Sequence, residues 1–399
     1  MKRILAKIKH ADFLKKIYKL IFIILSVMPR KKKVIFFESF LGKQYSCNPR
    51  AIYEYLKKHA PDYDCYWSYD PRYVRQFEGH NLKMIKRFSI PWLLVMSRAK
   101  YWVSNSRLPL WIPKPKKTLY LQTWHGTPLK KLGIDIEEIH MPGTTTEAYK
   151  KNFTDESSRW DFLISPNSYS SEIFQRAFRF EKQMIESGYP RNDYLYNYSE
   201  EDAFFIRKKL NIPTEKKVIL YAPTWRDNEY HARGQYKFSL KLDLERLQEE
   251  LGDDYVVVLR LHYLISDQLD VSHFDGFVID ASDYTDIREL YVISDVLITD
   301  YSSVFFDFAN LKRPIIFFVY DIESYRDQLR GFYFDFEKEA PGPLVKETSQ
   351  VIEELKRLKR GEVVALPTQF KQQFTYLEDG LATKRLVETV FGDKSESKS

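Results

Sequence analysis

The stretch Lys117–Lys131, KTLYLQTWHGTPLKK, is the most informative part of this 399-residue chain. Residues Lys117–Gln122 read as a short apolar strand, and Gly126 and Pro128 prevent its simple continuation. A histidine, a tryptophan and two threonines therefore stand at the end of a strand. In an open α/β sheet ligands bind at that edge, and histidine is the side chain best suited to move a proton near neutral pH. His125 is thus the first candidate functional residue.

Strand-like and helical patterns alternate on both sides of this stretch, which predicts parallel sheets with helical crossovers. Strands are expected near Val34–Glu38, Tyr63–Trp67, Lys83–Ile85, Tyr101–Ser104, Thr118–Gln122, Phe162–Ser165, Val218–Ala222, Tyr255–Leu261, Phe277–Ile279, Val296–Thr299 and Ile315–Val319. Helices are expected at Pro49–Lys58, Ser170–Phe178 and Val351–Arg360, and along the tail Phe370–Phe391. The length suits two domains, so the expected fold is α/β with two doubly wound domains facing across a cleft.

The chain divides into four expected segments. Residues 1–33 form a basic amphipathic segment, 34–195 an N-terminal domain, 196–391 a C-terminal domain and 392–399 a disordered tail. A turn at Pro190 and a charged stretch connect the two domains. No glycine-rich dinucleotide or P-loop fingerprint is present.

The positive charge of the chain is confined to its beginning. Residues 1–33 carry eleven Lys/Arg and one acidic residue, a net +10, so the rest of the chain carries −3 of the formal total of +7. A nucleic-acid cleft in the body is therefore not expected. The two cysteines, Cys47 and Cys65, form no disulfide framework and are expected to be reduced in a cytoplasmic protein.

The basic segment has an apolar stripe flanked by lysines, with Phe13, Ile17, Leu20 and Ile24 on one helical face. Its unbroken apolar run, Leu20–Met28, is far shorter than the roughly 20 residues that span a bilayer. We expect an interfacial helix on the inner leaflet of a membrane. The alternatives are a signal peptide, which lacks a cleavage site here, and a helix packed on the body or on a partner.

Two polar motifs follow strands in the second half. The first, TDYSS at 299–303, places Asp300 as a helix N-cap and Ser302 and Ser303 in the first turn, where free N–H groups bind phosphate; an ordinary capped helix is the simpler reading. In the second, Arg260 and His262 share a strand face and are suited to a diphosphate, although two solvated edge residues would show the same pattern.

Two further motifs, YAPTWRD at 221–227 and GYPRND at 188–193, also end or join strands. Their polar side chains are candidates for binding a ligand: Thr224, Arg226, Arg191 and Asn192. The simpler interpretation is turn chemistry, with each arginine paired to the aspartate that follows it, Asp193 or Asp227. No histidine or cysteine spacing fits a metal site, and no tightly bound cofactor is expected, with divalent-cation dependence left open.

Together these motifs resemble the CDP-glycerol glycerophosphotransferase family, which builds teichoic acids on the inner face of Gram-positive membranes. The resemblance covers about residues 34–391 and rests on ordered motifs: ESFLGKQYSCNPRAIYEYL at 38–56, LQTWHGTPLKKLG at 121–133, SPNSYSSEIF at 165–174, GYPRND, YAPTWRD, LRLHY at 259–263, TDYSS and LRGFYFDFEKEAPGPLV at 329–345.

The resemblance implies a GT-B fold and transfer of glycerol phosphate from CDP-glycerol to a hydroxyl of an undecaprenyl-diphosphate-linked acceptor, with release of CMP. His125 then resembles the catalytic base, with Trp124, Gly126 and Thr127 on the acceptor side. His262 resembles a catalytic ligand of the donor diphosphate together with Arg260, and Asp300, Ser302 and Ser303 complete the donor site. Extension of a primed acceptor is favoured by the short N-terminus.

Several alternatives remain open at this point. Within the same family, the alternatives are a primase that adds the first glycerol phosphate, an enzyme that uses CDP-ribitol, and a polymerase that makes a long chain. A GT-B glycosyltransferase that uses a nucleotide sugar belongs to a different reaction class and would release a nucleoside diphosphate. A non-catalytic membrane scaffold would not need His125.

Overall fold

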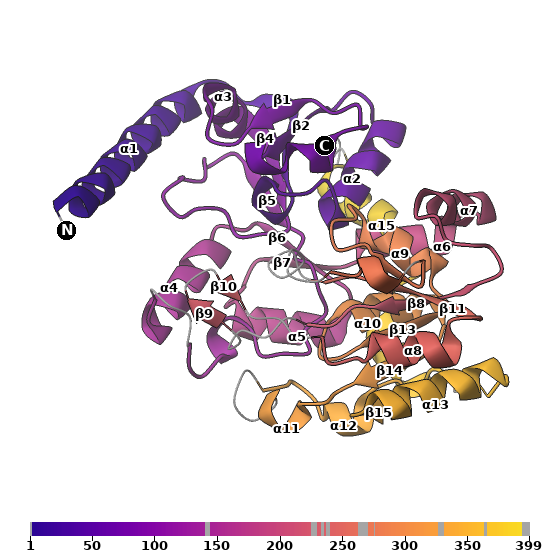
Figure 1. Cartoon of the computed structure of the whole chain (residues 1–399). Coiled ribbons are helices and arrows are strands. Elements are labelled where there is room, and N and C mark those ends of the chain that lie inside the picture. Colours follow the sequence, from indigo (N-terminus) through magenta and orange to yellow (C-terminus); the bar gives the residue numbers. More distant parts are fainter. Residues whose placement is uncertain are drawn as a thin grey trace.

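The computed structural model contains two parallel β-sheets, each covered by helices, and Figure 1 shows the two halves side by side. It describes residues 2–139, 144–224, 230–232, 235–236, 240–261, 270–274, 276–325, 331–362 and 365–392, with only the backbone of 2–12, 230–232 and 235–236.

The first sheet has the order β3-β2-β1-β4-β5-β6-β7 and is parallel throughout. Its strands are β1 Lys31–Glu38, β2 Asp64–Tyr69, β3 Met84–Lys86, β4 Ala99–Ser104, β5 Leu119–Gln122, β6 Phe162–Ser165 and β7 Gln183–Glu186. The chain order reverses between β1 and β4, which is the topological switch point where doubly wound folds bind ligands.

The second sheet has the order β12-β11-β8-β13-β14-β15 and is also parallel. Its strands are β8 Lys217–Tyr221, β11 Tyr255–Leu259, β12 Val278–Asp280, β13 Val296–Thr299, β14 Ile315–Phe318 and β15 Leu344–Val345. A separate antiparallel ribbon joins β9 Tyr230–Ala232 to β10 Gln235–Tyr236. The switch point lies between β8 and β13, so both domains open their ligand-binding edges toward a shared cleft.

The helices follow the strands as crossovers. They are α1 Lys2–Val27, α2 Cys47–His59, α3 Ile90–Arg98, α4 Thr146–Ser157, α5 Ser168–Ala177, α6 Tyr194–Asn197, α7 Glu200–Lys209, α8 Leu244–Leu251, α9 Ile287–Ile293, α10 Val304–Phe308, α11 Ile322–Ser324, α12 Phe336–Glu339, α13 Thr348–Lys359, α14 Thr368–Phe370 and α15 Ala382–Val390.

Apolar side chains cover both faces of each sheet, which explains the continuous apolar runs in the central strands. In the first domain, α1, α3, α4 and α5 pack on one face and α2 and α15 on the other. In the second, α7, α9, α10 and α12 cover one face while α8 and α13 cover the other. The strands predicted from sequence are all confirmed, although β11 ends at Leu259, before Arg260.

The C-terminal tail differs from the single helix expected for Phe370–Phe391. A π-helical turn at Lys371–Thr375 follows α14, and Gly380, with φ of +82°, ends this segment before α15 begins. Leu386 and Val390 of α15 are buried against the first sheet. The tail therefore crosses back to the N-terminal domain, although its position in sequence placed it in the C-terminal one.

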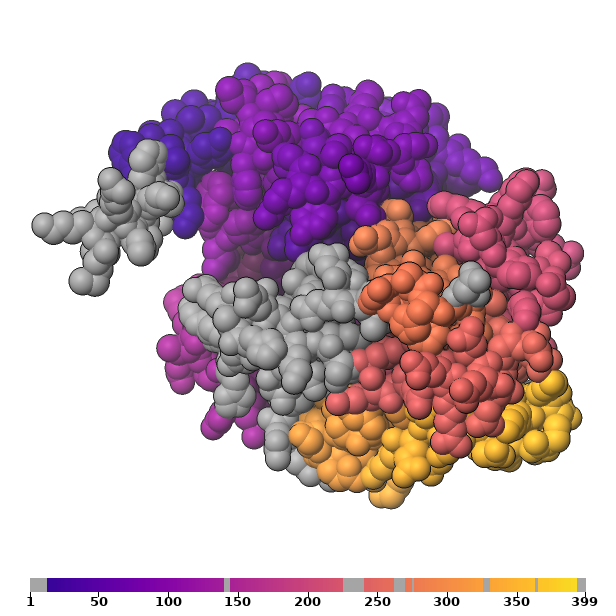
Figure 2. All heavy atoms as spheres, in the orientation of Figure 1, coloured from indigo at the N-terminus to yellow at the C-terminus, as the bar shows by residue number. Residues whose placement is uncertain are grey.

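Helix α1 attaches to the first domain through one stripe and exposes another. Phe22 is fully buried against Trp102, and the Tyr18 hydroxyl donates to the Phe88 carbonyl at 2.8 Å. Figure 2 shows the described part of α1 at the edge of the first domain. Among the described residues, no helix has the length and apolar character needed to cross a bilayer.

Candidate active site

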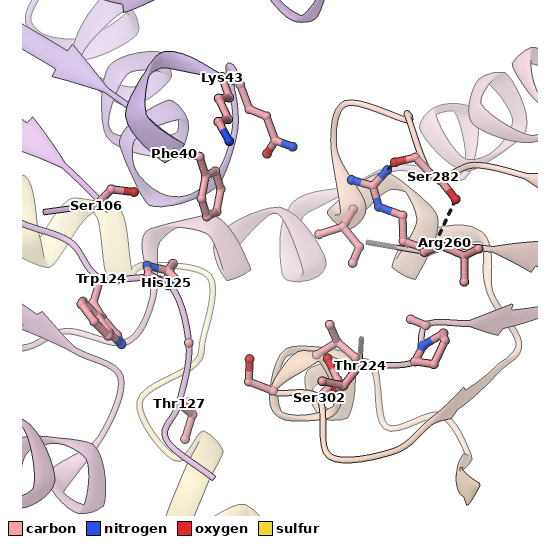
Figure 3. A pocket seen from close by; sticks show the side chains of 18 of the residues that line it. Phe40, Lys43, Ser106, Trp124, His125, Thr127, Thr224, Arg260, Ser282 and Ser302 are labelled. Atoms are coloured by element: carbon pink, nitrogen blue, oxygen red, sulfur yellow. Dashed lines mark hydrogen bonds between the residues drawn. The ribbon is translucent and has the colours of Figure 1, made fainter. Parts of the chain in front are cut away.

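A cavity of about 620 Å³ lies between the two domains at the carboxyl ends of their central strands. Its first wall comes from the loop after β1, the start of the segment after β4 and the turn after β5. Its second wall comes from the ends of β8, β11, β12 and β13. Eight of the residues expected to form the site line this cavity (Figure 3): Trp124, His125, Gly126, Thr127, Thr224, Arg260, Ser302 and Ser303.

The turn that carries His125 has a strained backbone. Trp124 has φ of +48°, a left-handed conformation that costs energy for a residue with a bulky side chain. Hydrogen bonds hold this conformation: the Gln122 side chain accepts from the Trp124 N–H at 3.0 Å, and the Asn48 amide donates to the Trp124 carbonyl at 3.2 Å. The strain turns the chain away from β5 and brings His125 to the cavity (Figure 3).

The His125 ring has a defined tautomer. Its Nδ1 lies 2.7 Å from the backbone carbonyl of Asn105, and because a carbonyl can only accept, Nδ1 carries the proton and Nε2 keeps a lone pair. Trp124 stacks on the ring at 4.7 Å and Phe40 meets it edge-on at 5.6 Å.

Burial among these groups lowers the pKa of His125 to about 4; the Asn105 carbonyl opposes the decrease and the charge of Arg191 adds to it. At the same time the side chain is open to the cavity. The imidazole is therefore neutral at pH 7 and able to accept a proton from a molecule in the cavity.

The opposite wall presents cationic and polar groups. The Arg260 guanidinium donates to the carbonyls of Ala281 and Ser282, which fix it at the cavity surface. Ser302 and Ser303 precede α10 at the end of β13. The two walls approach each other closely at Gly126, because a Cβ built there would lie 2.9 Å from Ser303 Oγ.

Asp300 is not the N-cap that the sequence predicted. Ser303 precedes the first residue of α10, and its side chain makes no capping hydrogen bond. The buried Asp300 carboxylate instead accepts from the Thr224 N–H at 2.8 Å. Asp300 thus joins the ends of β13 and β8 beneath the cavity surface, where it supports Thr224.

Arg191 and Asn192 are buried between the domains and do not line the cavity. Arg191 forms two hydrogen bonds, of 3.0 and 2.9 Å, with the Asp307 carboxylate on α10, and the Asn192 amide donates to the same group at 3.2 Å. The expected pairing of Arg191 with Asp193 is wrong, because the Asp193 carboxylate accepts from backbone N–H groups at the start of α15.

A second ion pair also crosses between the domains. Arg50 of α2 donates to the Asp286 carboxylate at 2.8 Å, and Arg288 pairs with the same carboxylate. The two arginines hold the pKa of Asp286 at about 2 against the opposing effect of burial. Two neighbouring sets of ion pairs, around Asp307 and around Asp286, therefore fix the relative position of the two walls.

His262 and Arg226 lie outside the described residues. The turn at Pro341–Pro343 does not line the cavity and packs against the start of β14: a Cβ on Gly342 would lie 2.1 Å from the Ile315 carbonyl oxygen. Among the described residues, no group of three His, Cys, Asp or Glu side chains is arranged to hold a metal ion.

Sequence reasoning missed the residues that surround His125. Phe40, Lys43 and Ser106 line the cavity, and Asn105 lies directly behind the histidine. A signal was present, because Asn105 and Ser106 follow a predicted strand just as His125 does. A proton acceptor on one wall and an arginine with hydroxyl and N–H donors on the other suit in-line transfer of a charged group across the cleft.

Known proteins are similar to this chain in sequence and in fold. The model of the family described as CDP-glycerol:poly(glycerophosphate) glycerophosphotransferase matches residues 20–392. A teichoic acid poly(glycerol phosphate) polymerase of Bacillus subtilis (strain 168) is 58% identical over 98% of this chain and 53% of its own length, so the chain spans about half of that relative. A teichoic acid glycerol-phosphate transferase of Staphylococcus aureus (strain NCTC 8325 / PS 47) is 49% identical over 93% of this chain and 95% of its own length.

A solved structure shows the same architecture. The wall teichoic acid polymerase TagF, in a variant soaked with CDPG, superposes with a TM-score of 0.87 at 44% identity, covering 98% of this chain and 97% of that one. The expected GT-B arrangement of two doubly wound domains is therefore confirmed.

Proposed function

The chain belongs to the CDP-glycerol:poly(glycerophosphate) glycerophosphotransferase family, and from that premise we propose that it transfers glycerol phosphate from CDP-glycerol to a hydroxyl of a lipid-linked teichoic acid acceptor. One observation carries the proposal: a neutral His125 with its Nδ1–H already bound faces Arg260, Ser302 and Ser303 across one cavity.

The reaction follows from these positions. The acceptor oxygen forms a bond to the β-phosphorus, the bond from that phosphorus to the bridging oxygen of CMP breaks, and the hydroxyl proton passes to Nε2 of His125. Arg260 and the Ser302 and Ser303 hydroxyls balance the charge that collects on the leaving CMP. We assign Thr224 and Asp300 to the same donor wall, with Asp300 acting through the Thr224 backbone.

Arg191 and Asn192 support the site from behind. They are buried and bound to Asp307 of α10, which follows Ser303 directly in the chain. Their proposed role in donor binding is therefore indirect: they hold α10, and with it the two serines, against the first domain. His262 and Arg226 remain proposed donor ligands because of the resemblance of their motifs.

We propose a primed acceptor, one that already carries glycerol phosphate. The relatives at 58% and 49% identity are named as a poly(glycerol phosphate) polymerase and a glycerol-phosphate transferase. Lys43 lines the cavity on the His125 side (Figure 3), with its ammonium 5.4 Å from the centroid of the Tyr73 ring. A cation there suits an acceptor with a phosphate close to its reacting hydroxyl.

The test is CMP release from CDP-glycerol and from CDP-ribitol, each with unprimed and glycerol-phosphate-primed lipid acceptor. We expect release from CDP-glycerol with the primed acceptor. Release with the unprimed acceptor alone would make the protein a primase, and release from CDP-ribitol would change the donor. If no pair releases CMP, and a nucleotide sugar releases a nucleoside diphosphate, a glycosyltransferase replaces this proposal.

We further propose that α1 docks the protein on the inner leaflet of the membrane, as a peripheral protein. The predicted lipid-facing stripe is not packed on the body: Phe13, Ile17, Leu20 and Ile24 are 37% to 62% exposed. The attached stripe contains Tyr18 and Phe22 instead. Lysines flank the exposed stripe, which suits anionic lipids.

Point substitutions test docking more cleanly than deletion of the helix, because deletion would also remove the buried Phe22. We expect Leu20→Asp with Ile24→Asp to abolish flotation with vesicles of anionic lipid. A matched control is Phe204→Asp with Phe205→Asp, two aromatic residues 51% and 55% exposed on α7. Retained flotation of the α1 variant, or equal loss in the control, would contradict the proposal.

A further inference from the structure

Asn105 lies directly behind the candidate base. It follows β4, at the carboxyl end of the first sheet, and its side chain is fully buried. Asn105 does not itself line the cavity, whereas its neighbour Ser106 does. A buried amide in this position must use its hydrogen-bonding groups within the protein.

The main chain of Asn105 fixes the direction of the base. Its carbonyl accepts the Nδ1–H of His125 at 2.7 Å. If this carbonyl moves, the imidazole rotates or adopts its other tautomer, in which Nε2 carries the proton and cannot accept one. The position of the Asn105 backbone therefore decides what fraction of the protein has His125 in the tautomer whose Nε2 can accept a proton.

The side chain of Asn105 anchors that backbone to the loop after β1. Its Oδ1 accepts from the Phe40 N–H at 2.8 Å and from the Ser106 hydroxyl at 3.2 Å. Its Nδ2 donates to Ser39 Oγ at 3.1 Å, and Ser39 Oγ donates onward to the Ser46 carbonyl at 3.1 Å. Because the Phe40 N–H can only donate, this network fixes which end of the amide is oxygen.

The loop held in this way is strained and forms the rim of the cavity. Phe40, Leu41 and Gly42 have φ of 45°, 60° and 81°, three consecutive left-handed residues of which only glycine adopts this conformation without cost. The Gly42 carbonyl accepts from the Asp70 N–H at 2.7 Å, which holds the far end. Phe40, Leu41 and Lys43 line the cavity, and the Phe40 ring meets His125 edge-on.

We propose that Asn105 is a positioning residue that couples the base to the acceptor-side rim, so that one buried amide sets both the tautomer of His125 and the conformation of residues 40–44. The expected changes in kcat and KM rest on the proposed function. The expected effect of Asn105 on the tautomer of His125 does not depend on any reaction. Asn105 acts through His125 and Phe40 and touches no substrate.

The kinetic test is Asn105→Ala, measured by CMP release with each substrate varied in turn. We expect kcat to fall on the order of 10- to 100-fold, since small misplacement of a catalytic group costs about this much. The KM for the acceptor should rise severalfold while the KM for CDP-glycerol stays within about twofold, because the donor wall belongs to the other domain. In a His125→Ala background the same change should have no further effect on kcat.

Two matched variants separate positioning from general loss of stability. Asn105→Asp keeps the acceptor for the Phe40 N–H, and we expect it to recover much of the lost kcat. Asn167→Ala removes another buried amide, which donates to the Phe374 carbonyl at 2.8 Å away from the cavity. That variant should lower thermal stability and leave both KM values unchanged.

A second readout needs no activity. With ¹⁵N-labelled histidine, the wild-type protein should show the Nδ1–H tautomer for His125. Asn105→Ala should show a mixture of the two tautomers, and Asn105→Asp, which keeps the acceptor for the Phe40 N–H, a smaller share of the Nε2–H form. An unchanged tautomer together with wild-type kinetics would overturn the proposal. Absence of CMP release from the wild type would overturn the proposed function instead, and the tautomer measurement would still decide the role of Asn105.

Discussion

Gly126→Ala offers a direct test of how the two walls of the cavity meet. Gly126 lies beside His125, and a Cβ at this position would come within 2.9 Å of Ser303 Oγ and 3.4 Å of Ser303 Cβ. The backbone of Gly126 does not have a positive φ, so alanine fits its conformation. The substitution therefore tests only the steric contact between the base-bearing turn and the start of α10.

The magnitude follows from that contact. Non-bonded contacts of a Cβ below 3.0 Å essentially do not occur, so either the Ser303 hydroxyl must rotate away or the turn must move. Overpacking of this kind costs about 1–3 kcal/mol. If the cost falls on the closed arrangement in which transfer occurs, kcat/KM should fall by roughly 5- to 150-fold, at 1.36 kcal/mol for each factor of ten.

The assay is a double-mutant cycle with Ser303→Ala, using acceptor-dependent CMP release and thermal unfolding. Ser303→Ala removes the hydroxyl in contact and keeps the more distant Cβ. In that background Gly126→Ala should lower kcat/KM by no more than about threefold. Equal losses in both backgrounds would show that the two residues are not in contact, and would refute the close approach of the walls.

Three further predictions concern the ionisable groups Arg191, Glu378 and His125. Arg191→Met leaves the Asp307 carboxylate buried without its cation and should lower the free energy of unfolding by about 3–5 kcal/mol. Arg72→Met removes an arginine on the surface and should change the free energy of unfolding far less; equal losses in chemical denaturation would contradict this. Burial raises the pKa of Glu378 to about 8 from its usual value near 4.5, so between these pH values the folded protein holds a proton that the unfolded chain releases. The free energy of unfolding should therefore fall as the pH rises from about 4.5 to 8 in the wild type, but not in Glu378→Gln. The low pKa of His125 predicts kcat/KM that is flat from pH 7 to about 5.5 and falls toward pH 4; a midpoint near 6.5 would show an unperturbed histidine.

The sequence predicted the sheets well because the central strands of a parallel sheet are buried on both faces and therefore read as apolar runs. Within the two parallel sheets, the strands that escaped prediction are β7 and β15, which are edge strands with few buried residues. Gln183–Glu186 has one buried position and Leu344–Val345 is two residues long, so neither produces an apolar run. The prediction failed where the physical signal is absent.

Residues at strand ends could be predicted as a group, but their partners could not. His125, Arg260 and Ser302 line one cavity because the topology brings strand ends together. Arg191 pairs with Asp307, 116 residues away, and not with the nearby Asp193, because folding places α10 against the turn. Asn105 escaped notice for a related reason: its importance comes from bonds to Ser39 and His125 that only the fold creates.

The most direct test of the account compares the wild type with His125→Ala in CMP release from CDP-glycerol with a glycerol-phosphate-primed lipid acceptor. We expect acceptor-dependent release by the wild type and a fall in kcat on the order of 10²–10⁴ in the variant, with its unfolding transition unchanged. Near wild-type turnover by a folded His125→Ala would contradict the assignment of the base, and with it the mechanism built on this cavity.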